Sequence, residues 1–572
     1  KGGDVLINKL KHYSWFIVLI AIMLMVISFP RQWYPLSIQS QLYKWIGPPA
    51  YAQIEATETP IVAFDLDQAC PEDLSGWRNA SAIEGVEILE AKTCVADNPF
   101  AVAAFVKGTN NISMETLMQS GLTQDAVTKG EDLDGDGDPD IIYIRLEVVE
   151  LNGFSPDSEE PSMAYEIAPG INPGFWVFAP KLSGHSTTSF ESNTARDMLR
   201  MPSPPIRVEQ GDKIYLTLEN THTTPHTIHL HGIDHPYMNS SGQGNDGVPT
   251  ISELPVLPGE SKTYELEPRV TGFGLYHCHV QPQVHIMMGL QGLFIVEPNM
   301  PDNWVQTLNI GAGQVRAPSK SITQSFDQEY DLHYLDLDSE LNNTIQEFND
   351  PRLIAKEMNR SFDMTKVKPN YFTLNGESFP YTFRDSLIIS GEDELIKLRV
   401  ANGGVNPVAF HLHGHRPKLT HLDGVELSET SSYQRDVFSL DTAQRVELTL
   451  NTTNDGSNSN GPGVWLYHDH KNQAVTNNGI GPGGHISALV YDDYISERGW
   501  PSLTGMSWGQ FFTEEYYKGE VTLWAEYAPG LASITGINAS LMLRLIIFGS
   551  SLMTLLMILI FKLRYFVKTR AV

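Results

Sequence analysis

The sequence predicts a mainly β protein with two similar β-sandwiches, a small additional region before them and an apolar segment near each end of the chain. Three observations predict this class. Alternating apolar and polar residues recur between Gly, Pro and Asn turns, one arrangement of histidines occurs twice, and 572 residues suffice for roughly three or four domains. The expected division is an apolar segment at 1–35, the additional region at 53–139, sandwiches at 140–300 and 320–495 with a linker at 301–319, a connector at 496–540 and a second apolar segment at 541–572.

The charge balance excludes one class of partner. Asp and Glu number 68 against 39 for Lys and Arg, which gives a net charge of −29. A nucleic acid is a lattice of negative phosphates and is bound by surfaces of the opposite sign. We therefore expect no nucleic-acid partner.

Two apolar segments indicate a membrane protein. The first, at 15–29, has 15 residues, a length that is marginal for a bilayer span and also fits the core of a secretion signal. The cleavage-type motif Ala50-Tyr51-Ala52 lies about twenty residues further on, too far for a signal, so we favour an uncleaved anchor. The second, at 545–561, is the expected C-terminal transmembrane helix, and a basic tail follows it.

Basic residues flank the outer ends of both apolar segments, which predicts that both termini are cytoplasmic. The chain between them then lies outside the cytoplasm at the cell membrane, in a periplasm or at the cell surface. The cysteines agree with this placement, because Cys70 and Cys94 are expected to form a disulfide in an oxidising compartment. Cys278 is left over and needs another explanation.

Strand-like alternation is the main secondary-structure signal between the apolar segments. It is clearest at 206–220, 262–268, 292–298, 395–404 and 445–451. Period-two patterns with frequent turns are typical of antiparallel β-sandwiches, and we expect no long helix outside the membrane.

Histidine pairs occur at matched places in the two halves. Random placement of 18 histidines gives on the order of 0.6 His-x-His pairs, whereas this chain has five, counting His413-Gly-His415. Alternate strand residues share a face, so each pair can present two imidazoles to one metal ion. The first half has His229-Leu-His231 followed by His277-Cys278-His279, and the second has His411-Leu-His413 followed by His468-Asp469-His470.

Cys278 narrows the choice of metal. Two imidazoles and a thiolate with a weak axial ligand form the blue-copper geometry, and His226 and His285 are the expected imidazoles. Leu290 is the expected axial residue, with Met287 and Met288 as competitors for the same place. A zinc-storing protein would have no need of this thiolate arrangement.

The run His226-Thr-Ile-His229-Leu-His231-Gly, followed by His277-Cys278-His279, resembles the copper motifs of the multicopper oxidases, the laccase and ceruloplasmin group. The resemblance covers about 140–495 and implies two cupredoxin-like Greek-key sandwiches, with the type 1 copper in the first. It implies that the type 1 ligands are His226, Cys278 and His285, the type 2 ligands His229 and His411, and the type 3 ligands His231, His277, His279, His413, His468 and His470.

The resemblance implies four coppers per chain, one of type 1, one of type 2 and two of type 3. It also implies oxidation of a one-electron donor at the type 1 site and four-electron reduction of O2 to water at a trinuclear cluster. Because Cys278 lies between two cluster histidines, one covalent segment joins the two sites. Asp246 and Asp234 are candidates for proton supply, although either could be an ordinary turn carboxylate. The second half has Val408 and Asp469 in place of type 1 ligands.

The two-domain relatives imply a homotrimer, in which the first domain of one chain meets the second domain of its neighbour. A larger membrane complex is also compatible with two anchors. The donor stays open among phenols, Cu(I), Fe(II), a small nitrogen compound and a protein carrier.

Two other functions are weighed. Copper nitrite reductases are also trimeric two-domain proteins, but they have Asp in a His-x-x-Asp-x-His stretch where this chain has His229. They also lack the full set of paired type 3 histidines. A non-catalytic copper or electron-transfer subunit is the third possibility. Such a protein would not need the eight histidines of a trinuclear cluster, all of which this chain has.

An acidic loop precedes the first sandwich and has carboxylates at every second position. This spacing can wrap calcium, although Tyr143 stands where an EF-hand would have its closing Glu. We expect a calcium loop without a catalytic part, and a solvated turn is the alternative. The expected ligands are Asp132, Asp134, Asp136, Asp138 and Asp140.

Overall fold

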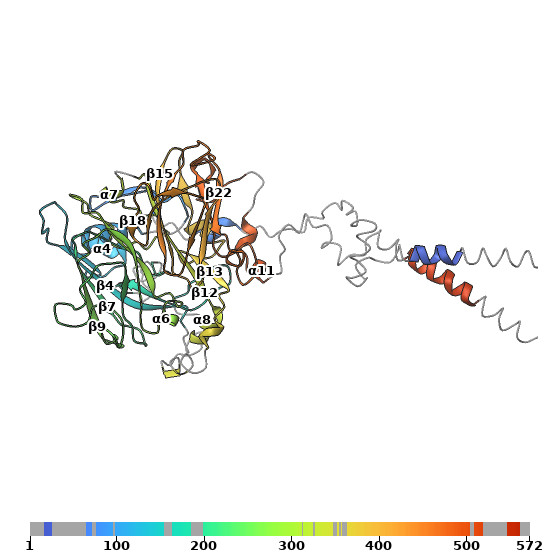
Figure 1. Cartoon of the computed structure of the whole chain (residues 1–572), viewed down its shortest axis with the longest axis horizontal. Coiled ribbons are helices and arrows are strands. Elements are labelled where there is room, and N and C mark those ends of the chain that lie inside the picture. Colours follow the sequence, from blue (N-terminus) through green and yellow to red (C-terminus); the bar gives the residue numbers. More distant parts are fainter. Residues whose placement is uncertain are drawn as a thin grey trace, which may run out of the picture. The chain divides into compact units, whose positions relative to one another are not determined.

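The computed structural model divides the chain into two units, residues 62–520 and residues 1–61 with 521–572. Figure 1 gives the course of the larger unit and labels some of its elements. The structure describes residues 17–25, 65–70, 76–94, 98–153, 163–184, 198–311, 313–323, 326–346, 352–353, 356, 363–503, 508–518 and 546–560.

Residues 17–25 and 546–560 are helical. Over the described part of the chain, no helix has both the length and the apolar character of a membrane span. The expected spans at 15–29 and 545–561 are therefore not supported, and their remaining residues lie outside the described ranges.

The first sandwich has two sheets. One is ordered β3-β4-β7-β9 with β5 paired to β4, and the other is ordered β6-β11-β10-β8. The strands of the first sheet are β3 (Val127–Gly130), β4 (Ile141–Leu151), β5 (Phe175–Pro180), β7 (Lys213–Glu219) and β9 (Ser261–Leu266). Those of the second are β6 (Ile206–Glu209), β8 (His229–His231), β10 (Gly272–His277) and β11 (Gln291–Glu297). The sandwich thus begins at β3, before the expected start at residue 140.

The second sandwich also has two sheets. One is ordered β13-β12-β15-β21-β17-β18 with β19 paired to β17, and the other β14-β23-β22-β16-β20. The strands of the first are β12 (Gln328–Leu337), β13 (Tyr371–Leu374), β15 (Leu395–Asn402), β17 (Lys418–Leu422), β18 (Val425–Glu426), β19 (Tyr433–Gln434) and β21 (Arg445–Asn451). Those of the second are β14 (Ile388–Ser390), β16 (Val408–Leu412), β20 (Val437–Leu440), β22 (Val464–Asp469) and β23 (Ile486–Tyr491).

The internal repeat is visible in the strand pairing. β4 runs parallel to β7, which pairs antiparallel with β9, and β12, β15 and β21 repeat this order. In the facing sheets, β6 pairs in parallel with β11 as β14 does with β23. The histidine-bearing strands take equivalent places, β8 beside β10 and β16 beside β22.

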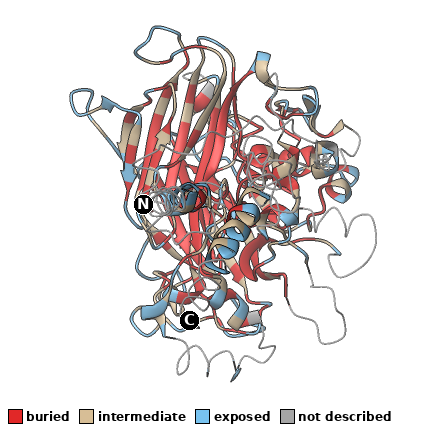
Figure 2. Cartoon of the chain, turned by 90° about the vertical axis from the view of Figure 1, so that its right-hand side faces the viewer, coloured by how far each residue is buried: buried red, intermediate tan, exposed pale blue. Residues whose placement is uncertain are grey.

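Apolar side chains of both sheets meet inside each sandwich. In β7, for example, Ile214, Leu216 and Leu218 are buried while the residues between them are more exposed. One core joins the sheets of the first sandwich and another those of the second, and Figure 2 shows the buried residues concentrated along the strands. The mainly β class is confirmed, because alternation places every second side chain in a core.

The additional region before the first sandwich holds the hairpin β1 (Ser81–Ile83) and β2 (Val86–Ile88) and the helices α3 (Pro99–Lys107) and α4 (Met114–Ser120). The Asn98 side chain accepts a hydrogen bond from the backbone N of Phe100 at 3.0 Å and so caps α3. Cys70 and Cys94 form a disulfide.

The remaining helices are short. Residues 508–518 of the expected connector pack on the second sandwich, where Phe511 contacts Phe379 with ring centroids 5.3 Å apart. The α-helices are α6 (Pro282–His285), α7 (Lys320–Thr323), α8 (Ser339–Gln346), α10 (Thr382–Asp385) and α11 (Glu514–Tyr517). The 3-10 turns are η2 (Leu66–Ala69), η4 (Met364–Lys366), η5 (Asn472–Val475), η6 (Asp492–Tyr494) and η7 (Gly509–Phe512).

A buried charge network joins the two sandwiches. Arg207 of β6 lies 2.8 Å from Glu297 and 3.1 Å from Asp331 of β12. Arg399 of β15 lies 3.2 Å from Asp331 and also pairs with Glu329. All five side chains are at most 2% exposed. Because solvent does not reach these side chains, each buried charge is compensated only by its partners in the network.

Replacement of Arg399 by Met is expected to destabilise the larger unit by about 3–5 kcal/mol, because Glu329 and Asp331 would keep buried charges without their partner. Thermal unfolding of the metal-free protein measures the loss. The control is Arg416→Met, which removes an exposed guanidinium that bonds only backbone carbonyls in the described structure. Equal midpoints for the two variants would contradict a stabilising role for the network.

Candidate metal centres

The first candidate centre is formed by His226, Cys278 and His285. His226 precedes β8, Cys278 follows β10 directly and His285 ends α6. Cys278 Sγ lies 3.6 Å from Nδ1 of His226 and 3.2 Å from Nδ1 of His285. The three donor atoms lie within 4.8 Å of one another, and all three residues are buried. They bring two imidazoles and a thiolate to one point, as a trigonal copper site requires.

The protonation of this centre tests whether a metal ion fits. Burial raises the pKa of the Cys278 thiol to about 12 and lowers that of His285 to about 3. Burial also lowers the pKa of His226 well below its usual value. The imidazoles therefore keep free lone pairs at neutral pH, and the thiol becomes a thiolate only when a cation compensates its charge. The donor set fits copper.

The sequence offers three candidates for the axial ligand of this centre. In the structure, the backbone at Leu290 lies against that of Cys278. The backbone N of Cys278 donates to the carbonyl of Leu290 at 3.0 Å. Met287 and Met288 are buried in the same core, but Sδ of Met288 accepts a hydrogen bond from Asn342 at 3.5 Å. The sulfur of Met288 is thus engaged with Asn342 of the helix at 339–346, whereas the axial role of Leu290 stays a prediction.

The histidine pairs of the first sandwich form a second centre. In the register of β8 and β10, His229 lies opposite His277. Nε2 of His277 lies 2.9 Å from Nε2 of His231, and the rings of His229 and His279 have centroids 5.2 Å apart. The strand period thus turns four imidazoles toward one another, as ligands of shared ions would be.

The second sandwich repeats this arrangement. His411 lies opposite His468 in the pairing of β16 with β22. Nε2 of His413 lies 3.3 Å from Nε2 of His468, and the rings of His411 and His470 have centroids 5.3 Å apart. The two four-histidine groups are therefore built from equivalent strands.

Backbone carbonyls fix the orientation of these rings. Nδ1 of His229 lies 2.6 Å from the carbonyl of Asp246, and Nδ1 of His411 lies 2.9 Å from that of Asp436. Nδ1 of His277 and of His468 bond in the same way to the carbonyl of the next residue. A ring that donates from Nδ1 presents a free Nε2 lone pair to a metal. The four rings are thus preset as Nε2 ligands.

The two candidate proton donors take different places. A carboxylate oxygen of Asp246 lies 3.4 Å from Nδ1 of His229 and 3.6 Å from Nε2 of His235, so Asp246 adjoins the histidine centre. Asp234 instead pairs with Arg269, which donates to it at 3.0 Å. Asp234 and Arg269 line an open pocket of about 440 Å³ that also includes His235. Asp246 is therefore the better placed of the two.

The second sandwich has an aspartate beside a histidine where the first has its thiolate. Asp469 occupies the position that corresponds to Cys278, and a carboxylate oxygen lies 3.5 Å from Nδ1 of His485. The other oxygen accepts bonds from the backbone N of Ala409 and Lys471 at 3.0 Å each. Val408 stands where the first sandwich has the ligand His226. The second sandwich therefore offers neither the thiolate nor this imidazole at the place that corresponds to the first centre.

The two four-histidine groups belong to different sandwiches. Within the described residues, each group of histidine nitrogens that lies within 4.8 Å comes from one sandwich only. Within one chain, as the structure describes it, the two groups therefore do not form a joint copper site.

The acidic loop brings three of its five carboxylates together. Oxygens of Asp132, Asp134 and Asp136 lie within 4.8 Å of one another. Asp140 instead accepts bonds from the loop backbone, among them one from the N of Asp134 at 3.2 Å. Asp138 accepts from the backbone N of Asn303 at 2.9 Å. Of the expected calcium ligands, the first three thus share a site while the last two hold the loop in place.

A buried acidic cluster lies behind this loop. Asp212 accepts a bond from the backbone N of Glu209 at 2.7 Å, and Nζ of Lys129 donates to the carbonyl of Val305 at 2.8 Å. Burial raises the pKa of Asp212 to about 7 and lowers that of Lys129 to about 8. The folded protein therefore takes up a proton at Asp212 at a pH where the unfolded chain would not.

Stability should depend on pH through Asp212. A carboxyl whose pKa is raised by folding stabilises the fold below its unfolded value, near 4, and this stability is lost as the pH rises toward about 7. We expect Asp212→Asn, which stays neutral, to be more stable than wild type at pH 8 by as much as about 4 kcal/mol, with a smaller difference at pH 4. Thermal unfolding of metal-free protein at both pH values measures this, with the exposed Asp493→Asn as control. Parallel pH curves for wild type and Asp212→Asn would exclude the titration.

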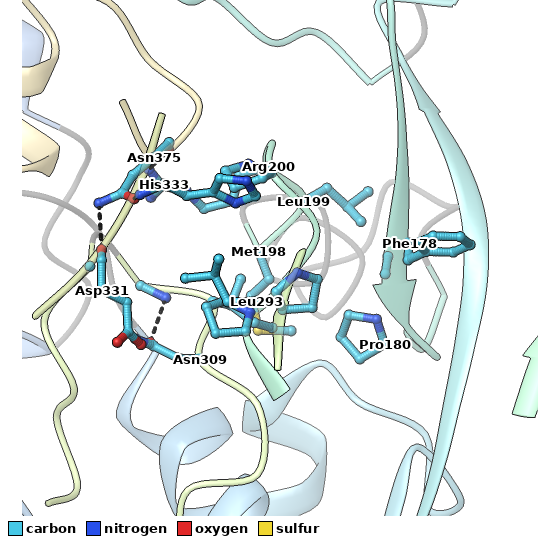
Figure 3. A pocket seen from close by; sticks show the side chains of 17 residues that line it. Phe178, Pro180, Met198, Leu199, Arg200, Leu293, Asn309, Asp331, His333 and Asn375 are labelled. Atoms are coloured by element: carbon cyan, nitrogen blue, oxygen red, sulfur yellow. Dashed lines mark hydrogen bonds between the residues drawn. The ribbon is translucent and has the colours of Figure 1, made fainter. Parts of the chain in front are cut away.

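A small cavity lies where the two sandwiches meet, with Leu199 and Leu293 on one side and His333 and Asn375 on the other (Figure 3). Its volume is about 30 Å³, the space of an ordered water rather than of a substrate. Both ring nitrogens of His333 are buried without a hydrogen-bond partner among the described residues. Burial lowers its pKa to about 3. The cavity therefore offers no substrate site.

Sequence reasoning missed several residues around the centres. His222 lies 2.9 Å from the ring of His226, and Trp176 contacts His285 with centroids 5.1 Å apart. The backbone carbonyl of Asp436 lies beside Nδ1 of His411 as that of Asp246 lies beside Nδ1 of His229. Asp436 follows its histidine pair at a greater distance along the chain than Asp246 does, and nothing local to the sequence of Trp176 indicates its contact.

Two segments match family models described as multicopper oxidase, residues 191–301 and residues 354–480. Among curated proteins, the oxidoreductase OpS5 of Beauveria bassiana is 29% identical over 147 residues, 25% of this chain and 24% of that protein. The iron transport multicopper oxidase FET3 of Saccharomyces cerevisiae is 25% identical over 266 residues, 45% of this chain and 34% of that protein. The chain thus spans about a quarter to a third of these relatives.

Among solved structures, the blue copper oxidase from Nitrosomonas europaea has a TM-score of 0.46 and 23% identity, over 66% of this chain and 93% of that chain.

Proposed function

We propose that this chain, an oxidoreductase that matches the multicopper oxidase family over residues 191–301 and 354–480, oxidises a one-electron donor at His226, Cys278 and His285 and reduces O2 to water at a trinuclear copper site. Four donors are oxidised for each O2, and four protons complete two waters. The observation that carries the proposal is the position of Cys278, whose thiol faces one centre while His277 and His279 belong to another.

Copper supplies the one-electron chemistry and the binding of O2 when it occupies these sites. The residues of the chain bind the ions, exclude water, connect the two centres and supply protons. The buried thiolate and imidazoles of the first centre exclude water and hold one ion, and the residues 277–279 connect it covalently with the histidine centre. The carboxylate of Asp246 beside His229 is the proposed source of protons.

We propose further that the trinuclear site forms between chains in a homotrimer. Each sandwich brings four of the eight histidines together, so the histidines of one chain's first sandwich need those of a neighbour's second sandwich. A head-to-tail contact of this kind closes as a ring, here of three copies. The proposed complement is four coppers per chain.

The function is tested on purified, copper-loaded protein. We expect an intense blue thiolate absorption, about four coppers per chain and the uptake of one O2 for every four donors oxidised. Phenols, Fe(II), Cu(I), a nitrogen compound and a reduced protein carrier are offered in turn, since the donor is not yet known. About two coppers per chain with nitrite turnover would indicate a nitrite reductase instead, and a blue protein that consumes no O2 would indicate a copper carrier.

The location outside the cytoplasm is likewise a proposal. The disulfide between Cys70 and Cys94 supports an oxidising compartment. Anchoring through 15–29 and 545–561 is tested by deletion of both 1–35 and 541–572 followed by fractionation, with a shift out of the membrane fraction expected if these segments anchor the chain.

We propose calcium for the loop of Asp132, Asp134 and Asp136, whose oxygens lie within 4.8 Å of one another. Free calcium at 100 times its Kd is expected to stabilise the protein by about 2.7 kcal/mol. Asp134→Asn should weaken this effect, and magnesium at the same concentration should not reproduce it. Thermal unfolding measures both, and an equal response of wild type and variant would leave the loop a solvated turn.

A further inference from the structure

We propose that His222, which is not a metal ligand, accepts the hydrogen bond that fixes His226 as an Nδ1 ligand and thereby lowers the reduction potential of the copper bound there. His222 is thus a positioning residue for the donor-oxidising centre. The inference rests on the proposed function only in taking that centre to be a copper site.

The contact between the two rings is direct. Nδ1 of His222 lies 2.9 Å from Nε2 of His226, and the ring centroids are 5.1 Å apart. Oγ1 of Thr224 lies 3.0 Å from Nδ1 of His222 and 3.1 Å from Nε2 of His226. The non-ligating nitrogen of His226 thus has two partners, both on the chain just before it.

The direction of the hydrogen bond follows from the ligand geometry. Nδ1 of His226 faces Cys278 Sγ, so this nitrogen is the one that binds copper and Nε2 carries the proton. Nε2–H of His226 then donates, and Nδ1 of His222 must accept with its lone pair. The remaining proton of His222 is on Nε2, which lies 4.0 Å from a carboxylate oxygen of Glu150.

Packing holds His222 in this position. Trp176 contacts the rings of His222, His226 and His285, with centroids 4.7, 6.0 and 5.1 Å apart. The backbone N of His222 donates to Oδ1 of Asn220 at 3.0 Å. His222 is 9% exposed and His226 is fully buried, so water cannot replace the acceptor at Nε2 of His226.

The expected effect on copper has a definite sign. An acceptor at the far nitrogen makes an imidazole ligand more basic, and a more basic ligand stabilises Cu(II) relative to Cu(I). Removal of the acceptor should therefore raise the potential. A histidine that only fills the core would leave the potential unchanged when replaced by a residue of similar size.

The test compares two variants of nearly equal size. His222→Asn keeps an acceptor oxygen near the place of Nδ1, whereas His222→Leu does not. Redox titration of the blue absorption and the Cu(II) hyperfine splitting are measured on copper-loaded protein. For His222→Leu we expect about a tenfold lower ratio of oxidised to reduced copper at a fixed solution potential, a rise of about 59 mV for one electron, together with a changed splitting. His222→Asn should stay close to wild type.

Equal potentials and splittings for wild type and His222→Leu would overturn the inference, and so would equal shifts in both variants, which would indicate a steric effect. If His222→Leu does not accumulate as folded protein, His222→Met fills a similar space without a nitrogen or oxygen acceptor and should raise the potential in the same way, so an unchanged potential there would overturn the inference. A wild-type protein without blue absorption would instead refute the proposed function.

Discussion

Cys278→Ser is expected to abolish the blue absorption and to lower donor-dependent O2 uptake more than about 100-fold. A hydroxyl does not provide the soft, charged donor that the trigonal site needs. The same change also interrupts the covalent segment between the two centres. Because His277 and His279 stay in place, copper content should fall by about one ion per chain rather than to zero.

Met288→Leu is the matched control, because Sδ of Met288 bonds Asn342 rather than serving the centre. The control should keep its blue absorption and its O2 uptake. A blue Cys278→Ser protein would refute the assignment of the thiolate, and loss of the colour in Met288→Leu would make that sulfur the axial ligand.

Mixing two inactive variants is expected to restore activity if the trinuclear site lies between chains. His231→Ala damages the first sandwich and His413→Ala the second, and each alone should lower O2 uptake at least about 100-fold. In trimers reassembled from equal amounts, about a quarter of the interfaces join two intact halves. About a quarter of the wild-type activity should therefore return, as measured by O2 uptake after unfolding and joint refolding.

A second mixture is the control for this experiment. His231→Ala and His277→Ala both damage the first sandwich, so no interface between them is intact and no activity should return. Recovery in this control would show reactivation by some other route. If refolded trimers of the first mixture stay inactive, the shared site between chains is wrong.

Much of the fold and of the metal centres could be predicted because both depend on short-range periodicity. The alternation of β7 placed Ile214, Leu216 and Leu218 in the core, and the same period turned the members of each histidine pair to one face. Boundaries were less predictable. β3 joins the first sandwich through its pairing with β4, and a four-residue strand before an acidic loop has too little pattern of its own to reveal that partner.

The candidate ligands were visible in the order of residues, because a metal site demands particular side chains at particular spacings, and their assignment to copper stays a prediction. The surroundings of these ligands were not visible in the sequence, since contacts between distant strands carry no local signal. Trp176 reaches His222 and His285 only because β5 packs beside the loops that follow other strands. In the same way, Asp234 turned to Arg269 while Asp246 turned to His229. Folding therefore settled which carboxylate adjoins the histidines and which ring bonds His226.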